Sequence, residues 1–269
     1  MKISRSSKKL KSAEIKNPYF EIQAEIGLTK HGGGRSATDE IASLCKLDQN
    51  SYVLDVGCGV GMSACYLAKK YGCKVIGIDI SEKMIKKATD RAKRMGLDEI
   101  VKFMVADAQN LPFEEGLFDA VISESVTAFL SDKEKGIKEY SRVLKNGGYV
   151  GLNEITWNGE AERNVASYMK RAMGEVVPET KENWTRLLEH SGFKVVIAKN
   201  HEMKIFSQWL NEIRSINASD YLKFMTKFIL LILKSQEHRD IMKDMVRDSM
   251  SMPKNFLKSW GYGIYIGRK

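Results

Sequence analysis

Short apolar runs that end in a carboxylate recur along the first half of the chain. The first run covers Tyr52–Leu54 and ends at Asp55; three others cover Lys74–Asp79, Val101–Asp107 and Phe118–Glu124. Apolar runs of this length, with no alternation of polar residues, are typical of strands that are buried on both faces of a sheet. We therefore expect four strands of one mainly parallel sheet.

Segments with helical periodicity separate these runs. Met62–Tyr71 predicts one helix, and Ser81 predicts the N-cap of a second helix that ends before Gly96. Other expected helices cover Asp39–Cys45, Lys133–Leu144, Glu160–Met173 and Glu179–Ser191. Further strands are expected at Tyr149–Glu154 (after a turn at Leu144–Gly148), at Phe193–Ala198 and at Gly261–Gly267. Strands that alternate with helices predict an α/β sheet covered on both faces.

A glycine loop follows the first strand in the sequence V-L-D-V-G-C-G-V-G, and it contains Gly57, Gly59 and Gly61. Glycine allows a sharp turn and lets a ligand approach the backbone closely. Asp55 precedes the first of these glycines by two residues. A carboxylate there suits a ligand with a positive charge better than a phosphate. Asp79 lies about twenty residues past the loop, where a carboxylate can accept the hydroxyls of a ribose.

This order of motifs resembles the class I S-adenosylmethionine-dependent methyltransferases, specifically their small-molecule branch named for ubiquinone and menaquinone biosynthesis. The specific motifs cover Asp39 to Tyr149. The resemblance implies a doubly wound, mainly parallel, seven-stranded Rossmann-like sheet, with an antiparallel last strand inserted beside the fifth. It also implies S-adenosylmethionine as the cofactor.

The cofactor would lie along the ends of the first strands. The resemblance implies that Asp55 stabilises the loop and the cofactor's ammonium, that Asp79 binds the ribose, and that Asp107 and Ala108 bind the adenine. The full predicted cofactor-binding set is Asp55, Gly57, Cys58, Gly59, Gly61, Asp79, Ile80, Met84, Asp107, Ala108 and Ser123.

Three residues are candidate catalytic groups. His31 stands before three glycines, in a segment that folds over the cofactor in similar enzymes, and it could be a base or a hydrogen-bonding group. Glu124 follows the fourth strand, and Glu154 ends the fifth, where Asn153 and Trp157 are expected as pocket walls. Two alternatives stay open: His31 could simply position its loop, and Glu154 could only anchor a neighbouring one.

The acceptor is expected to be a small molecule, hydrophobic ones included, methylated at O, N or C. The sequence around Glu124 lacks the Asn/Asp-Pro-Pro-aromatic motif of enzymes that methylate base amines, and no Pro-Cys pair exists. Two alternatives are a dinucleotide-dependent oxidoreductase, whose third glycine would fall at Met62, and a non-catalytic protein that binds S-adenosylmethionine.

The charge is concentrated at one end. The chain of 269 residues has a formal charge of +9, and residues 1–16 hold six basic residues against one acidic residue. We expect a solvated basic tail; a weak contact with anionic lipid or RNA is the alternative. No nucleic-acid partner is expected for the rest of the chain. The four cysteines lack metal-ligand spacing, so we expect buried thiols and no metal site.

Three regions are expected: the tail (1–16), a core domain (17–200 and 260–269) and a helical insertion (201–259). The insertion carries apolar residues at helical spacing in Ser219–Leu233. This pattern predicts a helix that packs against the domain or a twofold partner in a homodimer, a lid over a hydrophobic acceptor pocket, or a helix that docks on a membrane surface. No apolar run reaches the roughly 18–20 residues of a membrane span, so we expect no membrane insertion and a cytoplasmic location.

Overall fold

The computed structural model describes residues 31–160, 162–173, 176–202 and 250–269, with six single positions between 226 and 247. The predicted basic tail lies outside the described residues. So does the predicted helix Ser219–Leu233, apart from Thr226.

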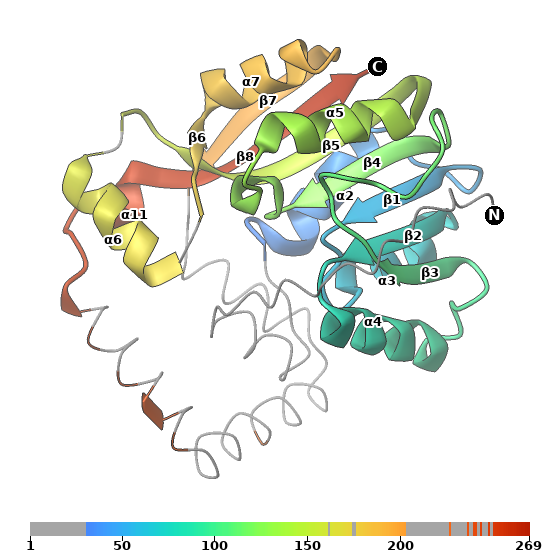
Figure 1. Ribbon diagram of the computed structural model, residues 1–269, viewed down its shortest axis with the longest axis horizontal. Coiled ribbons are helices and arrows are strands. Elements are labelled where there is room, and N and C mark those ends of the chain that lie inside the picture. The colour runs from blue at the N-terminus through green and yellow to red at the C-terminus, as the bar shows by residue number, and fades with distance from the viewer. Residues whose placement is uncertain are drawn as a thin grey trace.

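The strands form one sheet in the order β3-β2-β1-β4-β5-β8-β7, and the short strand β6 pairs with the end of β5 (Figure 1). Strands β1 to β5 run parallel, and β8 is antiparallel to both β5 and β7. The predicted architecture, with the last strand inserted beside the fifth, is confirmed. The strand bounds are β1 Tyr52–Val56, β2 Lys74–Asp79, β3 Val101–Val105, β4 Phe118–Glu124, β5 Leu144–Trp157, β6 Glu179–Thr180, β7 Lys194–Glu202 and β8 Trp260–Arg268.

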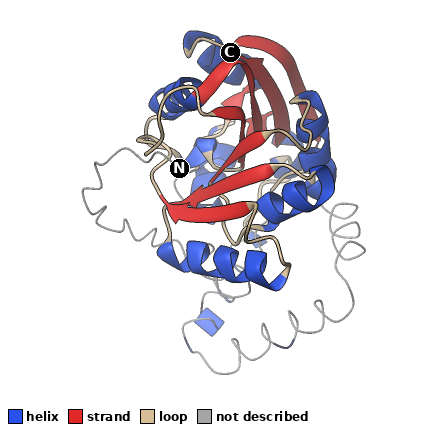
Figure 2. Ribbon diagram, turned by 90° about the vertical axis from the view of Figure 1, so that its right-hand side faces the viewer, coloured by secondary structure: helices blue, strands red, loops and turns tan. Residues whose placement is uncertain are grey.

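Helices cover both faces of the sheet (Figures 1 and 2). Neighbouring residues of β1 point to opposite faces: Leu54 belongs to a buried cluster with α5 and α7, and Val53 to a cluster with α2 and α3. This arrangement is why the strands are apolar throughout. The helix bounds are α2 Gly34–Leu44, α3 Met62–Tyr71, α4 Glu82–Arg94, the 3₁₀ helix η1 Thr127–Phe129, α5 Lys133–Val143, α6 Arg163–Met173, α7 Lys181–His190 and α11 Phe256–Ser259.

Side-chain caps fix several helix starts. Ser81 accepts a hydrogen bond from the Met84 amide at the start of α4, as predicted, and Asp132 accepts one from the Lys135 amide at the start of α5. The helix expected at Asp39–Cys45 begins earlier, at Gly34, because the residues before Asp39 already belong to the same amphipathic turn.

Several predicted boundaries differ from the structure: α6 and α7 begin later than expected, and β5 and β7 extend to Trp157 and Glu202. The third strand ends at Val105 because Asp107 enters a turn, in which its Oδ1 accepts a hydrogen bond from the Gln109 amide at 2.8 Å. The turn expected at Leu144–Gly148 is part of β5. Leu144 pairs with Phe118 and Tyr149 with Ala120. The residues between Leu144 and Tyr149 therefore bulge out of the pairing between β4 and β5.

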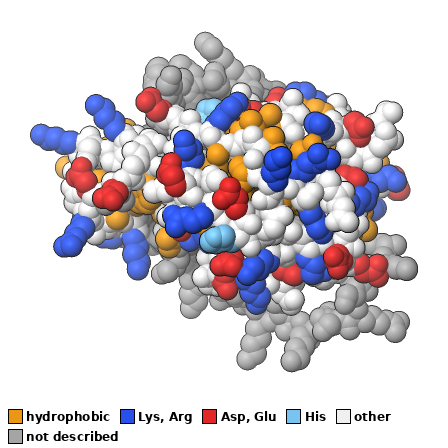
Figure 3. Space-filling model, turned by 90° about the horizontal axis from the view of Figure 1, so that it is seen from above, with side chains coloured by type: hydrophobic (Ala, Val, Ile, Leu, Met, Phe, Trp, Pro, Cys, Tyr) orange, Lys and Arg blue, Asp and Glu red, His pale blue; other side chains and the backbone are white. Residues whose placement is uncertain are grey.

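The surface and the thiols agree with the expectations from composition. Positive and negative side chains are interspersed on the face shown in Figure 3. All four cysteines are buried free thiols, and burial raises the pKa of Cys65 and of Cys73 to about 11. In the described part of the chain, no cluster of three or more potential ligands could hold a metal ion. None of the helices described there is long and apolar enough to cross a bilayer.

Candidate functional site

Three carboxylates meet where β1, β2 and β4 end. Asp55, Asp79 and Glu124 lie at the same edge because these strands are parallel neighbours. Asp55 is only 2% exposed, and burial raises its pKa well above the usual value; the nearby Glu124 and Asp79 raise it further. Its Oδ2 atom has no hydrogen-bond partner in the described structure. An unpartnered buried carboxylate oxygen beside two more carboxylates suits a cation.

The glycine loop needs backbone angles that other residues rarely adopt. Gly57, Gly59 and Gly61 have φ values of 67°, 51° and 75°. A Cβ on Gly57 would lie 2.2 Å from a methyl carbon of Val126, and one on Gly61 would lie 2.6 Å from the Phe103 ring. The loop therefore packs directly against Val126 and Phe103 before it enters α3. Its backbone amides lie near the three carboxylates.

Asp79 ties the glycine loop to the end of β2. Its Oδ2 accepts a hydrogen bond from the Gly59 amide at 3.0 Å, and its Oδ1 accepts one from the Ser81 amide at 2.9 Å. Burial raises the pKa of Asp79, although these amides lower it. The Asp79 carbonyl also accepts from the Ala106 amide at 3.1 Å, which brings the segment with Asp107 alongside.

The other predicted cofactor residues flank this loop. Met84 is buried with Val60 and packs beside Met62, while Cys58 and Ala108 are also buried and Ile80 is half-buried. Ser123 differs from the rest of the predicted set. Its fully buried hydroxyl contacts Thr127 Oγ1 at 2.9 Å, on the α5 face of the sheet.

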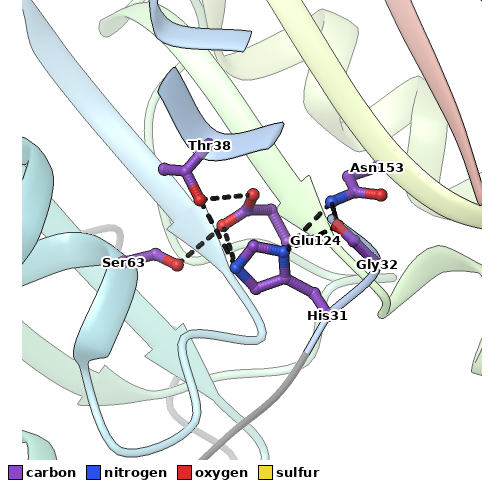
Figure 4. Close-up of polar contacts among 6 residues, drawn as sticks. All are labelled: His31, Gly32, Thr38, Ser63, Glu124 and Asn153. Carbon is purple, nitrogen blue, oxygen red and sulfur yellow. Dashed lines mark hydrogen bonds and ion pairs between the residues drawn. The ribbon is translucent and has the colours of Figure 1, made fainter. Parts of the chain in front are cut away.

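Glu124 is the centre of a polar cluster formed by His31, Thr38, Ser63 and Glu124 (Figure 4). The Thr38 hydroxyl of α2 donates to its Oε1 at 2.9 Å, and the Ser63 hydroxyl of α3 donates to its Oε2 at 2.6 Å. Nε2 of His31 lies 3.5 Å from the same Oε2. The side chains of His31 and Glu124 are 15% and 4% exposed, so the cluster is nearly closed to water.

Asn153 of β5 holds His31 from the other side of the ring. Its Nδ2 lies 3.1 Å from His31 Nδ1 and 2.7 Å from the Gly32 carbonyl oxygen. In the β4–β5 register Asn153 is the partner of Glu124, so both side chains reach the same face. Two predicted residues, His31 and Glu124, are thus brought together with the expected pocket wall Asn153.

Glu154 does not join this cluster. It is fully buried on the opposite face, where it accepts hydrogen bonds from the backbone amides of Thr127 at 2.8 Å, Val126 at 3.2 Å and Ala128 at 3.2 Å. Burial raises the pKa of Glu154 to about 7, although these amides lower it. All these contacts fit the anchoring alternative, and none connects Glu154 to the acceptor side. Its catalytic role stays a prediction that the geometry does not favour.

Thr38 and Ser63 were missed by reasoning from the sequence. Neither belongs to a motif, and they lie 86 and 61 positions from Glu124. One weak signal existed for Ser63, which stands two residues after Gly61 in the first turn of α3. Trp157, expected as a pocket wall, is the last residue of β5, four positions past Asn153, and it pairs with Trp260.

The comparisons with known proteins agree with this geometry. Residues 54–152 match the family model described as a methyltransferase domain. An uncharacterised protein of Haemophilus influenzae is 35% identical over 188 residues, which are 68% of this chain and 75% of that protein. The chain belongs to the class I S-adenosylmethionine-dependent methyltransferases.

Two further proteins illustrate the range of the methyltransferase family. Phosphoethanolamine N-methyltransferase 1 of Zea mays is 31% identical over 193 residues, which are 71% of this chain but only 38% of the maize enzyme. A methyltransferase of Thiobacillus denitrificans, solved with S-adenosylhomocysteine, shares the fold with a TM-score of 0.71 at 18% identity, over 93% of this chain and 98% of that one.

The cofactor of the methyltransferase is S-adenosylmethionine, and the residues present fit it. The unpartnered Asp55 Oδ2 suits the cofactor's ammonium group. The amides of Cys58, Gly59 and Gly61 already donate to Ile78, Asp79 and Cys58, so they stabilise the loop itself. Asp79 has a carboxylate at the strand end where the ribose is expected. Each of these residue assignments remains a prediction.

Proposed function

We propose that this methyltransferase transfers the methyl group of S-adenosylmethionine to the amine nitrogen of a small molecule. The observation that carries the proposal is the charge of the site. Asp55 and Asp79 are the carboxylates assigned to the cofactor, and Glu124 lies at the same edge, with no ion pair to a Lys or Arg side chain among the described residues.

Charge separates the three kinds of acceptor atom. The bound cofactor supplies a methyl group on a positively charged sulfonium. An amine gains positive charge as it accepts this methyl group, so a carboxylate beside it stabilises the transition state. A phenolate or a carbanion carries negative charge before attack, and the same carboxylate disfavours its binding.

Glu124 is the carboxylate best placed for this role. The hydroxyls of Thr38 and Ser63 donate to its two oxygens, and His31 Nε2 lies 3.5 Å from Oε2, so polar groups from three segments meet at this carboxylate. The name of the maize relative also gives an amine-bearing acceptor. A hydrophobic acceptor and a homodimeric state stay predictions, because most of residues 201–259 lie outside the described structure.

The proposal is tested by transfer of a radiolabelled methyl group to a panel of small amines and to alcohols and phenols with the same carbon skeletons. We expect labelled products from amines. The variant Glu124→Gln should keep cofactor affinity, measured by calorimetry, and lose about 10²-fold in turnover because it keeps the shape and removes the charge.

Glu134→Gln is the matched control, since Glu134 is an exposed glutamate of α5 paired with Lys138. It should leave turnover unchanged. Methylation of the phenols but not of the amines would overturn the amine assignment. Cofactor binding without transfer to any amine of the panel would likewise overturn the amine assignment.

A further inference from the structure

We propose that Asn153 fixes the tautomer of His31, so that His31 is a hydrogen-bond donor that positions Glu124 and is not the base for the acceptor. The part of this inference that concerns turnover rests on the proposed function. The part that concerns the tautomer does not.

The orientation of the Asn153 amide is decided by the Gly32 carbonyl. Asn153 is fully buried, and its Nδ2 lies 2.7 Å from the Gly32 oxygen. A carbonyl oxygen can only accept a hydrogen bond, so the amide nitrogen must be the atom that faces it. The reversed amide would place two acceptor oxygens 2.7 Å apart, where they would repel each other.

The same amide nitrogen then decides the protonation of His31. It carries two hydrogens; one is donated to Gly32, and the other faces His31 Nδ1 at 3.1 Å. Nδ1 must therefore present its lone pair. Nδ1 also lies 3.2 Å from the Gly32 oxygen, but a proton placed there would confront the Asn153 N–H. In the neutral imidazole the proton is consequently on Nε2.

The other edge of the ring needs that proton. Nε2 lies 3.4 Å from Thr38 Oγ1 and 3.5 Å from Glu124 Oε2. The Thr38 hydroxyl uses its own hydrogen on Glu124 Oε1, so it can only accept from His31. A lone pair on Nε2 would face the Thr38 hydroxyl oxygen and the Glu124 carboxylate, and neither of these can donate a hydrogen bond to it. Neither ring nitrogen is then available to remove a proton from an acceptor.

The backbone around His31 is held as firmly as its ring. A Cβ on Gly32 would lie 2.4 Å from Tyr262 Cβ, and one on Gly33 would lie 2.6 Å from Tyr262 Oη. Tyr262 belongs to β8, which pairs with β5 beside Asn153. Side chains of β5 and β8 thus both pack against the segment that contains His31. This packing gives the donor at Nε2 a fixed position relative to Glu124.

The tautomer is tested by long-range ¹H–¹⁵N spectra of the full-length protein with labelled histidines, at a pH where the imidazoles are neutral. The His31 signals are assigned by their loss in His31→Gln. We expect an unprotonated Nδ1 and a protonated Nε2 in the parent protein, and a mixture of tautomers in Asn153→Ala. A protonated Nδ1 in the parent, or an unchanged spectrum in Asn153→Ala, would overturn the proposal.

The role of His31 as a donor is tested with two substitutions, whose amide side chains differ in length. The Gln side chain places an N–H near the position of Nε2, whereas the Asn side chain reaches only to the position of Nδ1, and neither is a base. We expect His31→Gln to keep turnover within about threefold of the parent with an unchanged pH profile, and His31→Asn to lose about tenfold. If both variants lose about 10²-fold and the limb of the pH profile that reports the base disappears, His31 is a general base and the proposal is wrong. If no amine is methylated at all, the proposed function fails, while the spectra still decide the tautomer.

Discussion

Glu124 and Glu154 are the same residue type near the C-terminal ends of the neighbouring parallel strands β4 and β5, yet the fold uses them differently. Glu154 accepts hydrogen bonds from three consecutive backbone amides on the α5 face. Glu124 is contacted only by side chains, from three separate segments, on the face of α2 and α3. Backbone amides cannot turn away, so they make a carboxylate part of the fold, whereas side-chain donors can rearrange around a ligand. The donors of a buried carboxylate therefore tell more about its role than its burial does.

The largest expected effect is on stability. Glu154→Ala leaves three buried amides without an acceptor and should lower the free energy of unfolding by about 3–5 kcal/mol. Glu124→Ala should lower it by about 1 kcal/mol, because the hydroxyls of Thr38 and Ser63 can turn to other partners. Urea denaturation followed by circular dichroism measures both. Equal losses in the two variants would contradict the distinction between them.

The next effect is a pH dependence carried by Glu154. Its pKa is raised from the usual 4.5 to about 7 in the folded protein, so the folded state binds the proton more tightly than the unfolded state. This contribution to stability is complete below pH 4.5 and is lost as the pH rises through about 7, a decrease of about 3 kcal/mol.

Denaturation at pH 5 and at pH 8 measures this decrease. The variant Glu154→Gln cannot ionise and should show a smaller difference between the two pH values. The burial that raises the pKa values of Asp55 and Asp79 acts in the same direction, so the variant should keep part of the dependence. A variant as pH-dependent as the parent would show that Glu154 does not carry the effect.

The smallest effect concerns the donors of Glu124. Thr38→Val and Ser63→Ala each remove one hydroxyl and should cost about 1 kcal/mol of stability in the parent protein. In a background with Glu124→Leu, which has no acceptor, both should become nearly neutral. This double-mutant cycle measures the coupling of each hydroxyl to the carboxylate. Costs that are unchanged in that background would mean that the hydroxyls stabilise something else.

Much of the fold could be predicted from the sequence because local patterns determine it. The predicted ranges Met62–Tyr71, Lys74–Asp79 and Phe118–Glu124 agree with the structure at both ends. Each lies between clear signals, such as the glycine loop before α3 and Gly72 at its C-cap. The start of β5 was missed because it depends on a longer-range contact, the pairing of Leu144 with Phe118, which keeps a glycine-rich turn within the strand.

The site could be predicted only in part. Glu124 and His31 were candidates by position, but their contact with Asn153 joins residues 122 positions apart and depends on the strand register. Glu154 and Ser123 were placed in the site although alternate side chains along a strand point to opposite faces. Counting from Asn153 and Glu124, this alternation assigns Glu154 and Ser123 to the other face, so the signal was present in the sequence.

The place of β8 in the sheet has a consequence for synthesis. β7 meets the rest of the sheet only through β8, which comes last among the described elements and lies between β5 and β7. While the ribosome is still making residues before Trp260, the edge of β5 from Tyr149 to Trp157 and the whole of β7 lack the partner they have in the finished fold. Unpaired strand edges invite association with other chains. A nascent chain of this protein should therefore depend on chaperones until Trp260–Arg268 emerges. The packing of Tyr262 against Gly32 and Gly33 also forms only at that moment.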